Sequence, residues 1–324
     1  MTTKYWDGST DGDLNTAANW TPSGVPEAAD DVVFDGRTTQ DVDGSLTTFN
    51  NVDLGSLTIE NGYSGTIGGA STPMEFICSA GLAYVAGTGA YYLQCDAGAD
   101  VDGAVLQCII NGGTTYLSSQ ANDNTNAAVW TEVQVLAGTV YIQGDSDSGS
   151  HGGDTGTAVT TLKVTPINSC TVTIGDLCVN FKGTDAPMNV IMGGGTVTCS
   201  SALGDVLQLG GTLNYGSSST DMSTTDDDIT TLRIAGGTFN WIPQNTSGTV
   251  LSASPTIGTM YVIKGLFDAS DTKDTASSDP TITTVWQYGG TVDLRNVFAN
   301  FAITTYNAEG GELHYSPGQV LSLS

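Results

Sequence analysis

The chain has 324 residues, of which 34 are acidic and only 8 are basic, for a formal net charge of −26. This balance argues against a nucleic-acid-binding protein, because phosphate recognition depends on clustered Lys and Arg. Charged residues make up 13% of the chain, against about 25% in a typical globular protein. The 42 glycines and many small polar residues fill the other polar positions, a composition that favours turns and strands over helices.

The N-terminus shows no targeting signal. Residues 1–13 pass from Met1 into an Asp- and Gly-rich stretch without an apolar segment, which predicts a protein synthesised in the cytoplasm and not exported. No apolar stretch reaches the length of about 20 residues that a membrane-spanning helix needs. We therefore expect no membrane partner.

Residues 1–50 differ from the rest of the chain. They carry Trp6, Trp20 and Phe34 among Asp-rich clusters and lack the repeat found further on. An atypical terminal segment with large aromatic residues is typical of a cap, which covers the open end of a repeat protein's core. We predict that residues 1–50 form a cap or attachment segment in which Trp6, Trp20 and Phe34 cap or anchor that end.

Residues 51–324 contain a recurring phrase of two short strands joined by a glycine turn. Its clearest copies start at Ile229, Ile257, Ile282 and Ile303, which are 28, 25 and 21 residues apart. Shorter versions occur at residues 112–117, 138–142, 194–199 and 210–215. A period in the low to middle twenties, in β-rich sequence with variable insertions, is typical of a solenoid.

Alternation within the copies separates inward from outward side chains. The residues expected to face inward are Phe239, Trp241, Phe267, Ala269, Val292, Leu294, Leu313 and Tyr315. Those expected to face outward are Asn240, Asp268, Asp293 and His314. Stacking the copies about 4.8 Å apart gives one continuous core, so the sequence predicts an all-β fold, a right-handed parallel β-helix over residues 51–324. A β-sandwich or jelly roll is the main alternative, because short strands at a spacing of about 8 to 12 residues fit parts of the chain.

The opening of the chain carries a motif: Asn19-Trp, Gly24-Val-Pro and Asp30-Asp-Val-Val-Phe-Asp, followed by the segments 54–59 and 65–67. Over residues 5–67 it resembles the opening of β-solenoid proteins found in tailed-phage genomes and in some secreted bacterial proteins. The resemblance implies a structural virion protein, most simply a decoration or spike protein on the capsid exterior, bound to other virion proteins and assembled as a homotrimer. A tail fibre or tailspike that binds or cleaves host surface glycans is the alternative, since a shared fold does not transfer function.

Candidate catalytic groups are sparse. The chain has no phosphate-binding Gly-Lys loop, no nucleophile elbow and no zincin motif, so we expect no catalytic residues, no cofactor and no enzyme. Asp268 and Asp293, one coil apart, would match the carboxylate spacing of a retaining glycosidase, which is the basis of the glycan depolymerase alternative. His314 is expected in a surface row, and His151 in a polar insertion at residues 144–156.

Metal-ligand patterns are equally weak. Residues 7–13 have the composition of a calcium loop but lack the spacing of an EF-hand, so we expect a solvated acidic turn and no metal site. The six cysteines show no zinc spacing, and each lies in or beside an apolar segment. They are therefore expected to be buried free thiols, with Cys178 and Cys199, 21 residues apart, stacked as interior neighbours.

Two aromatic residues stand out on the predicted outer face. Tyr261 and Trp286 fall at equivalent positions in adjacent copies, between inward residues. Exposed aromatic rings are costly in water and usually mark an interface or a glycan platform. We predict that Tyr261 and Trp286 contact a partner chain in the homotrimer.

Overall fold

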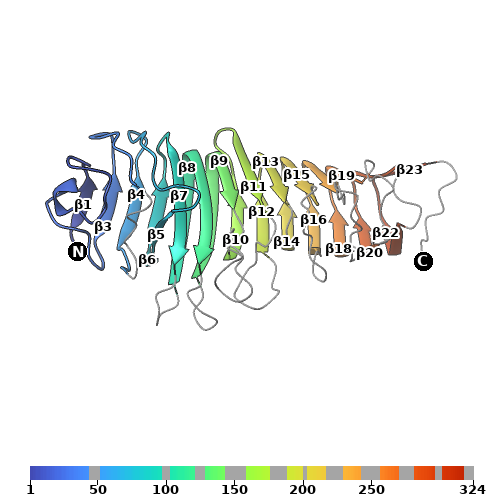
Figure 1. The fold of residues 1–324 in the computed structure, drawn as a ribbon. Coiled ribbons are helices and arrows are strands. Elements are labelled where there is room, and N and C mark those ends of the chain that lie inside the picture. The colour runs from blue at the N-terminus through green and yellow to red at the C-terminus, as the bar shows by residue number, and fades with distance from the viewer. Residues whose placement is uncertain are drawn as a thin grey trace. The chain divides into compact units, whose positions relative to one another are not determined.

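The computed structural model describes residues 1–43, 52–96, 103–120, 128–142, 158–175, 188–199, 203–216, 229–241, 256–269, 281–295 and 301–316. Figure 1 draws the described strands as arrows. The chain divides into two compact units. Unit 1 comprises residues 1–162, 166–171 and 177–184, and unit 2 comprises residues 163–165, 172–176 and 185–324. Strands β10 (Ala158–Val164) and β11 (Cys170–Ile174) contribute residues to both units. Within the described residues, no helix is long and apolar enough to cross a membrane.

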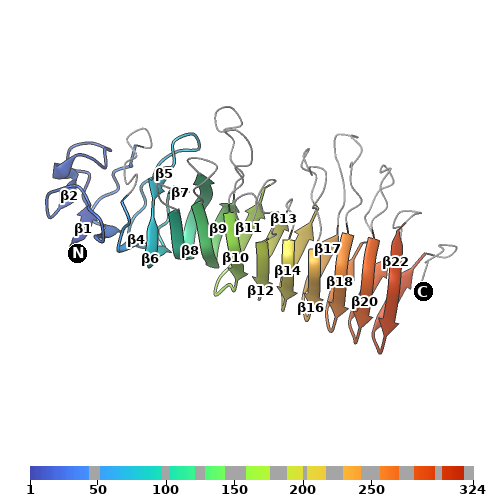
Figure 2. The ribbon, with the colours of Figure 1, turned by 90° about the horizontal axis from the view of Figure 1, so that it is seen from below.

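Unit 2 is a β-solenoid whose coils each contribute two strands. The first row consists of parallel neighbours, in the order β12 (Met188–Met192), β14 (Leu203–Gln208), β16 (Ile229–Ile234), β18 (Thr256–Val262), β20 (Thr281–Gln287) and β22 (Ala302–Ala308). The second row follows in the same way, as β13 (Thr196–Cys199), β15 (Thr212–Tyr215), β17 (Thr238–Trp241), β19 (Leu266–Asp268), β21 (Thr291–Leu294) and β23 (Glu312–Tyr315). Figure 2 shows the first row side by side.

The repeat found in the sequence aligns with the coils. Ile229 pairs with Ile257, Ile257 with Ile282 and Ile282 with Ile303. In the second row Phe239 pairs with Phe267, their ring centroids are 5.7 Å apart, and both side chains are fully buried. Parallel pairing of successive copies confirms the β-solenoid, and it contradicts the sandwich, whose sheets are antiparallel.

The expected inward residues are buried in all coils except the last one described. Phe239, Trp241, Val292 and Leu294 are at most 1% exposed. The prediction is wrong for Tyr315, which is 54% exposed, and Leu313 is only half-buried. Both lie on β23, beyond which the described residues form no further strand, so an inward side chain there has a described neighbour coil on one side only.

Unit 1 is a second parallel solenoid with longer strands. One row runs β1 (Thr3–Trp6), β3 (Asp31–Phe34), β4 (Ser56–Ile59), β6 (Cys78–Val85), β8 (Gly103–Gln120) and β9 (Ala128–Ile142). A second row joins β5 (Met74–Phe76) and β7 (Ala90–Asp96) to the later part of β8. Strands β8 and β9 therefore each serve both rows.

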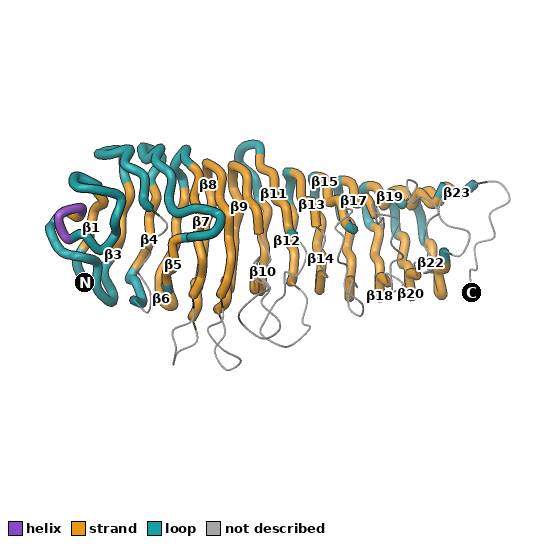
Figure 3. Tube along the Cα trace, viewed as in Figure 1, coloured by secondary structure: helices purple, strands orange, loops and turns teal. Residues whose placement is uncertain are grey.

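The N-terminal segment of unit 1 departs from the repeat. Here β2 (Trp20–Thr21) pairs antiparallel with β1, after the single 3-10 helix of the described residues, η1 (Ala17–Asn19), shown in Figure 3 beside β1. Trp6, Trp20 and Phe34 are at most 1% exposed, and their ring centroids lie 5.2 to 6.0 Å apart. Phe34 also contacts Tyr63 at 5.5 Å, which joins this aromatic cluster to the interior of the next coils.

In unit 2, from β12 and β13 onward, a glycine with left-handed backbone forms the corner between the two strands of each coil. Gly237 has φ +76°, and a Cβ built on it would lie 2.3 Å from the carbonyl oxygen of Gly211 in the coil before. The following amide, of Thr238, donates a hydrogen bond of 2.8 Å to the same carbonyl. The corner therefore excludes any side chain while it bonds one coil to the next. The corners that share this geometry in unit 2 are Gly211, Gly237, Gly265, Gly290 and Gly311.

We predict that Gly237→Ala destabilises unit 2 strongly. The left-handed backbone alone costs about 1–2 kcal/mol for a residue with a Cβ, and the overlap with Gly211 adds to this. Gly193→Ala is the matched control, because its Cβ would meet nothing closer than 3.7 Å. Thermal and denaturant unfolding should show a lower midpoint for Gly237→Ala alone. Equal midpoints for the two variants would contradict the role of the corner.

Candidate functional site

Tyr261 and Trp286 lie side by side on the outer face of unit 2, as the sequence predicted. They are register partners on β18 and β20, and both are half-buried. On the other side of Tyr261 lies Arg233 of β16, whose guanidinium carbon is 5.4 Å from the centre of the tyrosine ring. Trp286 lies parallel to Tyr288, with ring centroids 6.4 Å apart. A cation and three aromatic rings thus share one face.

Apolar side chains continue this face around the neighbouring turn. Leu209, Ile263 and Tyr288 are 53%, 49% and 45% exposed, and each directly follows the last residue of β14, β18 or β20. We name the whole set the aromatic corner: Leu209, Arg233, Tyr261, Ile263, Trp286 and Tyr288. Leu209, Ile263 and Tyr288 were not predicted from the sequence. Their common place, just before the glycine turn of a copy, was the signal that could have found them.

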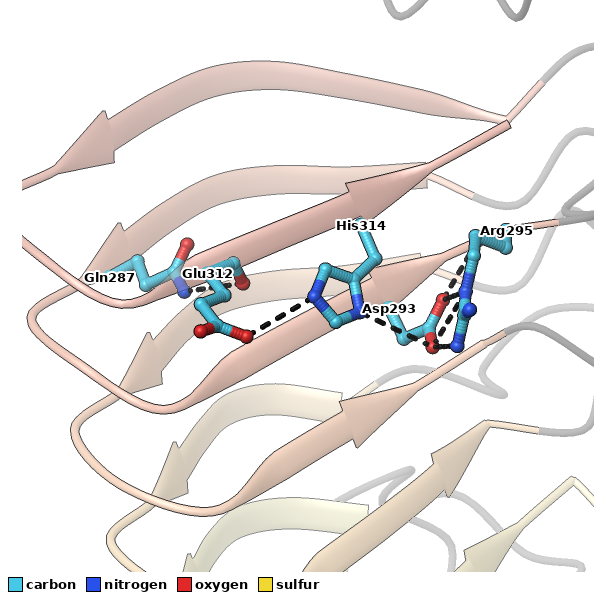
Figure 4. A network of polar contacts seen from close by, with 5 residues as sticks. All are labelled: Gln287, Asp293, Arg295, Glu312 and His314. Carbon is cyan, nitrogen blue, oxygen red and sulfur yellow. Dashed lines mark hydrogen bonds and ion pairs between the residues drawn. The ribbon is translucent and has the colours of Figure 1, made fainter. Parts of the chain in front are cut away.

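Asp268 and Asp293 are also register partners, on β19 and β21. The Asp293 carboxylate is held by Arg295, whose Nε donates hydrogen bonds of 2.9 and 3.1 Å to its two oxygens (Figure 4). These hydrogen bonds from Arg295 lower the pKa of Asp293, more than burial raises it. The two carboxylates therefore belong to adjacent coils, but that of Asp293 already forms an ion pair with Arg295.

The ion pair with Arg295 limits the part that Asp293 could play in glycoside cleavage. A retaining glycosidase needs one carboxyl group with a raised pKa, which can protonate the leaving oxygen. Arg295 moves the pKa of Asp293 in the opposite direction. Asp293 is thus a poor general acid.

Asp293 was expected to face outward but is only 5% exposed. His314 extends the same row as the register partner of Asp293 (Figure 4). Its Nδ1 lies 3.8 Å from the Asp293 carboxylate and its Nε2 lies 3.2 Å from the Glu312 carboxylate. Earlier in the row, Asn240 Nδ2 donates a hydrogen bond of 2.8 Å to Asn214 Oδ1. Successive coils are thus connected within this row at Asn214–Asn240 and at Asp293–His314.

The rings of Trp6, Trp20 and Phe34 are buried in unit 1 and do not form a docking surface. Trp6 Nε1 donates to the carbonyl of Gln40 at 3.2 Å, and Trp20 Nε1 donates to the carbonyl of Leu14 at 2.8 Å. These bonds satisfy the indole groups inside the protein. That residues 1–50 form a cap or an attachment segment stays a prediction, and residues 44–50 lie outside the described ones.

The acidic turn at residues 7–13 is organised around a buried amide. Asn19, fully buried, accepts a hydrogen bond from the Thr10 amide at 2.8 Å and donates one to the Asp11 carboxylate at 2.6 Å. Asp7 and Asp11 also accept backbone amides of the turn. In the part of the chain that the structure describes, no group of three or more His, Cys, Asp or Glu side chains is placed to hold a metal.

Five cysteines are free and buried, as expected: Cys78, Cys95, Cys108, Cys170 and Cys199. Burial raises the pKa of Cys78 to about 11 and that of Cys108 to about 12, so both remain protonated thiols at neutral pH. Cys178, His151 and the insertion at residues 144–156 lie outside the described residues. The expected stacking of Cys178 on Cys199 therefore stays a prediction.

Comparisons with family models, with curated proteins and with solved structures find no match to this chain. The function proposed below therefore depends on the residues and contacts of this chain and on the motif of residues 5–67.

Proposed function

We propose that the protein is a structural component of a tailed-phage virion, a decoration or spike protein on the capsid exterior. The motif at residues 5–67 and the stacked parallel coils of both units support this proposal. A solenoid core of interlocked coils gives a rigid body whose outer faces are free to contact other molecules. Rigidity and an extended outer surface are what a virion surface protein needs.

The charge of the chain supports the exterior location. A net charge of −26 repels packaged DNA, so an interior position costs more free energy than an exterior one. The same charge keeps neighbouring particles apart and in solution.

The proposal includes no enzymatic activity. Its support is the ion pair between Arg295 and Asp293, which holds the pKa of Asp293 below its ordinary value and makes this carboxylate a poor general acid. The alternative, a tail fibre or tailspike that binds or cleaves host glycans, is favoured by one observation, the parallel rings of Trp286 and Tyr288 on the outer face.

We further propose a homotrimer that buries the aromatic corner. Three of its apolar side chains are 45% to 53% exposed, and exposed clusters of this kind are typical of protein interfaces. Arg233 and Lys264, which lies exposed beside Ile263, would there meet the acidic surface of a second copy. Burial of the rings would offset the repulsion between chains that each carry −26.

Mass spectrometry of purified particles tests the virion assignment. We expect the protein in intact phage particles at many copies per virion, and expect it to be released with capsid proteins and not with tails. Incubation with host capsular and lipopolysaccharide glycans should release no reducing ends or unsaturated sugars. Glycan release that is abolished by Asp268→Asn or Asp293→Asn would overturn the structural assignment in favour of a tailspike.

Light scattering tests the trimer. We expect a mass three times the 33.3 kDa of one chain, with assembly strengthened by salt, which screens like-charge repulsion over about 10 Å at 0.1 M. Tyr261→Ser with Trp286→Ser should shift the protein toward monomer. Asn307→Ser, at the register partner of Trp286 on β22, is the control and should remain trimeric. A monomer at all concentrations, or an unchanged trimer in the double variant, would contradict the proposed interface.

A further inference from the structure

Three tyrosines form a continuous stack along the outer face of unit 1. Tyr92 on β7 pairs with Tyr116 on β8, and Tyr116 pairs with Tyr141 on β9. The ring centroids of Tyr92 and Tyr116 are 4.3 Å apart with an interplanar angle of 4°, and those of Tyr116 and Tyr141 are 4.8 Å apart at 10°. We name these three residues the tyrosine column.

The column lies at the surface and not in the core. All three side chains are half-buried, whereas the residues on either side of Tyr116, Thr115 and Leu117, are fully buried. The hydroxyl groups of Tyr92 and Tyr116 are hydrogen-bonded to each other, and partial burial together with the neighbouring phenols raises the pKa of Tyr116. The Tyr116 phenol is thus neutral at neutral pH, and the three rings contact one another at the surface.

Parallel coils stack equivalent rings on one another, as they do for Phe239 and Phe267 in the core of unit 2. The tyrosine column differs in carrying phenol groups at the surface, where an oxidant can reach them. The tyrosines are in register at a coil spacing of about 4.8 Å. The ring carbons that neighbour each hydroxyl group therefore lie about as close to the same carbons of the next tyrosine as the two ring centroids lie to each other. Those carbons carry the unpaired electron density of a tyrosyl radical, so two radicals on neighbouring coils would be held in contact.

We propose that the tyrosine column is a site of oxidative cross-linking, in which Tyr116 forms dityrosine with Tyr92 or Tyr141. The oxidant is hydrogen peroxide acting through a haem peroxidase. Each phenol loses one electron and one proton, the two radicals join by a carbon–carbon bond between the ring positions next to the hydroxyls, and each of those positions then loses its hydrogen as the phenol re-forms. Two phenols and one hydrogen peroxide thus give one dityrosine and two waters.

The geometry makes Tyr116 the common partner. Tyr92 and Tyr141 are separated by the coil that carries Tyr116, so they cannot join directly. A link from Tyr116 to either neighbour ties two successive coils together covalently. The link closes a loop of sequence and so restricts the unfolded chain, as a disulfide does. This inference is independent of the virion assignment, because it depends only on the contacts of unit 1.

The test treats the purified full chain with horseradish peroxidase and hydrogen peroxide. We expect dityrosine fluorescence in a product that still migrates as a single chain and has lost two hydrogens. Peptide mass spectrometry should join the peptide of Tyr116 to that of Tyr92 or Tyr141. Because proximity converts the coupling into an intramolecular step, we expect Tyr116→Phe to lower the yield about tenfold or more.

Phenylalanine keeps the ring, so the variants should fold as the parent does, which unfolding midpoints will verify. Tyr84→Phe is the matched control: Tyr84 is a half-buried residue of β6 whose hydroxyl accepts a hydrogen bond from Asn111, and the variant should give the full yield. Tyr141→Phe should keep the link between Tyr92 and Tyr116. An unchanged yield in Tyr116→Phe, or links only between separate chains, would overturn the proposal.

Discussion

The left-handed glycine at each corner is the constraint on which the other features depend. At Gly237 the chain turns with φ +76°, in contact with Gly211 of the coil before, and the amide that follows bonds to that same glycine. Because only glycine fits, the corner recurs at one fixed place in each coil of unit 2 from β12 and β13 onward. The strands that leave it therefore start in register, and register decides which side chains enter the core.

A fixed corner gives each later position in the coil a fixed environment. Two residues after the corner glycine, Phe239 and Phe267 stack in the core. The position three residues after the corner glycine lies on the outer face of the strand, and the residue type at this position differs between the two units. In unit 2 this position holds polar residues, Asn240, Asp268 and Asp293 among them, whereas after Gly113 and Gly138 of unit 1 it holds tyrosines.

Much of this arrangement could be predicted from the sequence, because the Gly-Gly-Thr phrase reveals the corner itself. From it follow the parallel coils, the buried Phe239 and Val292, and the outward neighbours Tyr261 and Trp286. The tyrosine column was missed, although Tyr116 and Tyr141 each stand three residues after a corner glycine. In that region the strands β8 and β9 run through the corner without a break, so the repeat is masked by continuous β-rich sequence.

Other features lie beyond what alternation can predict. Alternation predicts that Asp293 is an outward carboxylate. It does not predict that Arg295, two residues later, binds this carboxylate and lowers its pKa. It likewise marks Tyr315 as inward, although burial requires a coil on both sides and β23 is the last described strand. Long-range partners and the ends of a stack depend on tertiary contacts, which a local pattern does not contain.

The most direct test of in-register stacking is a distance measured across several coils of unit 2. Asp205 on β14 connects by successive register partners, Thr231, Thr259 and Thr284, to Thr305 on β22. Spin labels at Asp205→Cys and Thr305→Cys should lie about 19 Å apart, four strand spacings of about 4.8 Å. Labels at Asp205→Cys and Thr231→Cys should show the strong dipolar broadening of adjacent strands, and the parent chain, with its described cysteines buried, measures background labelling. A distance well away from four spacings, or no broadening in the adjacent pair, would contradict the stacked solenoid.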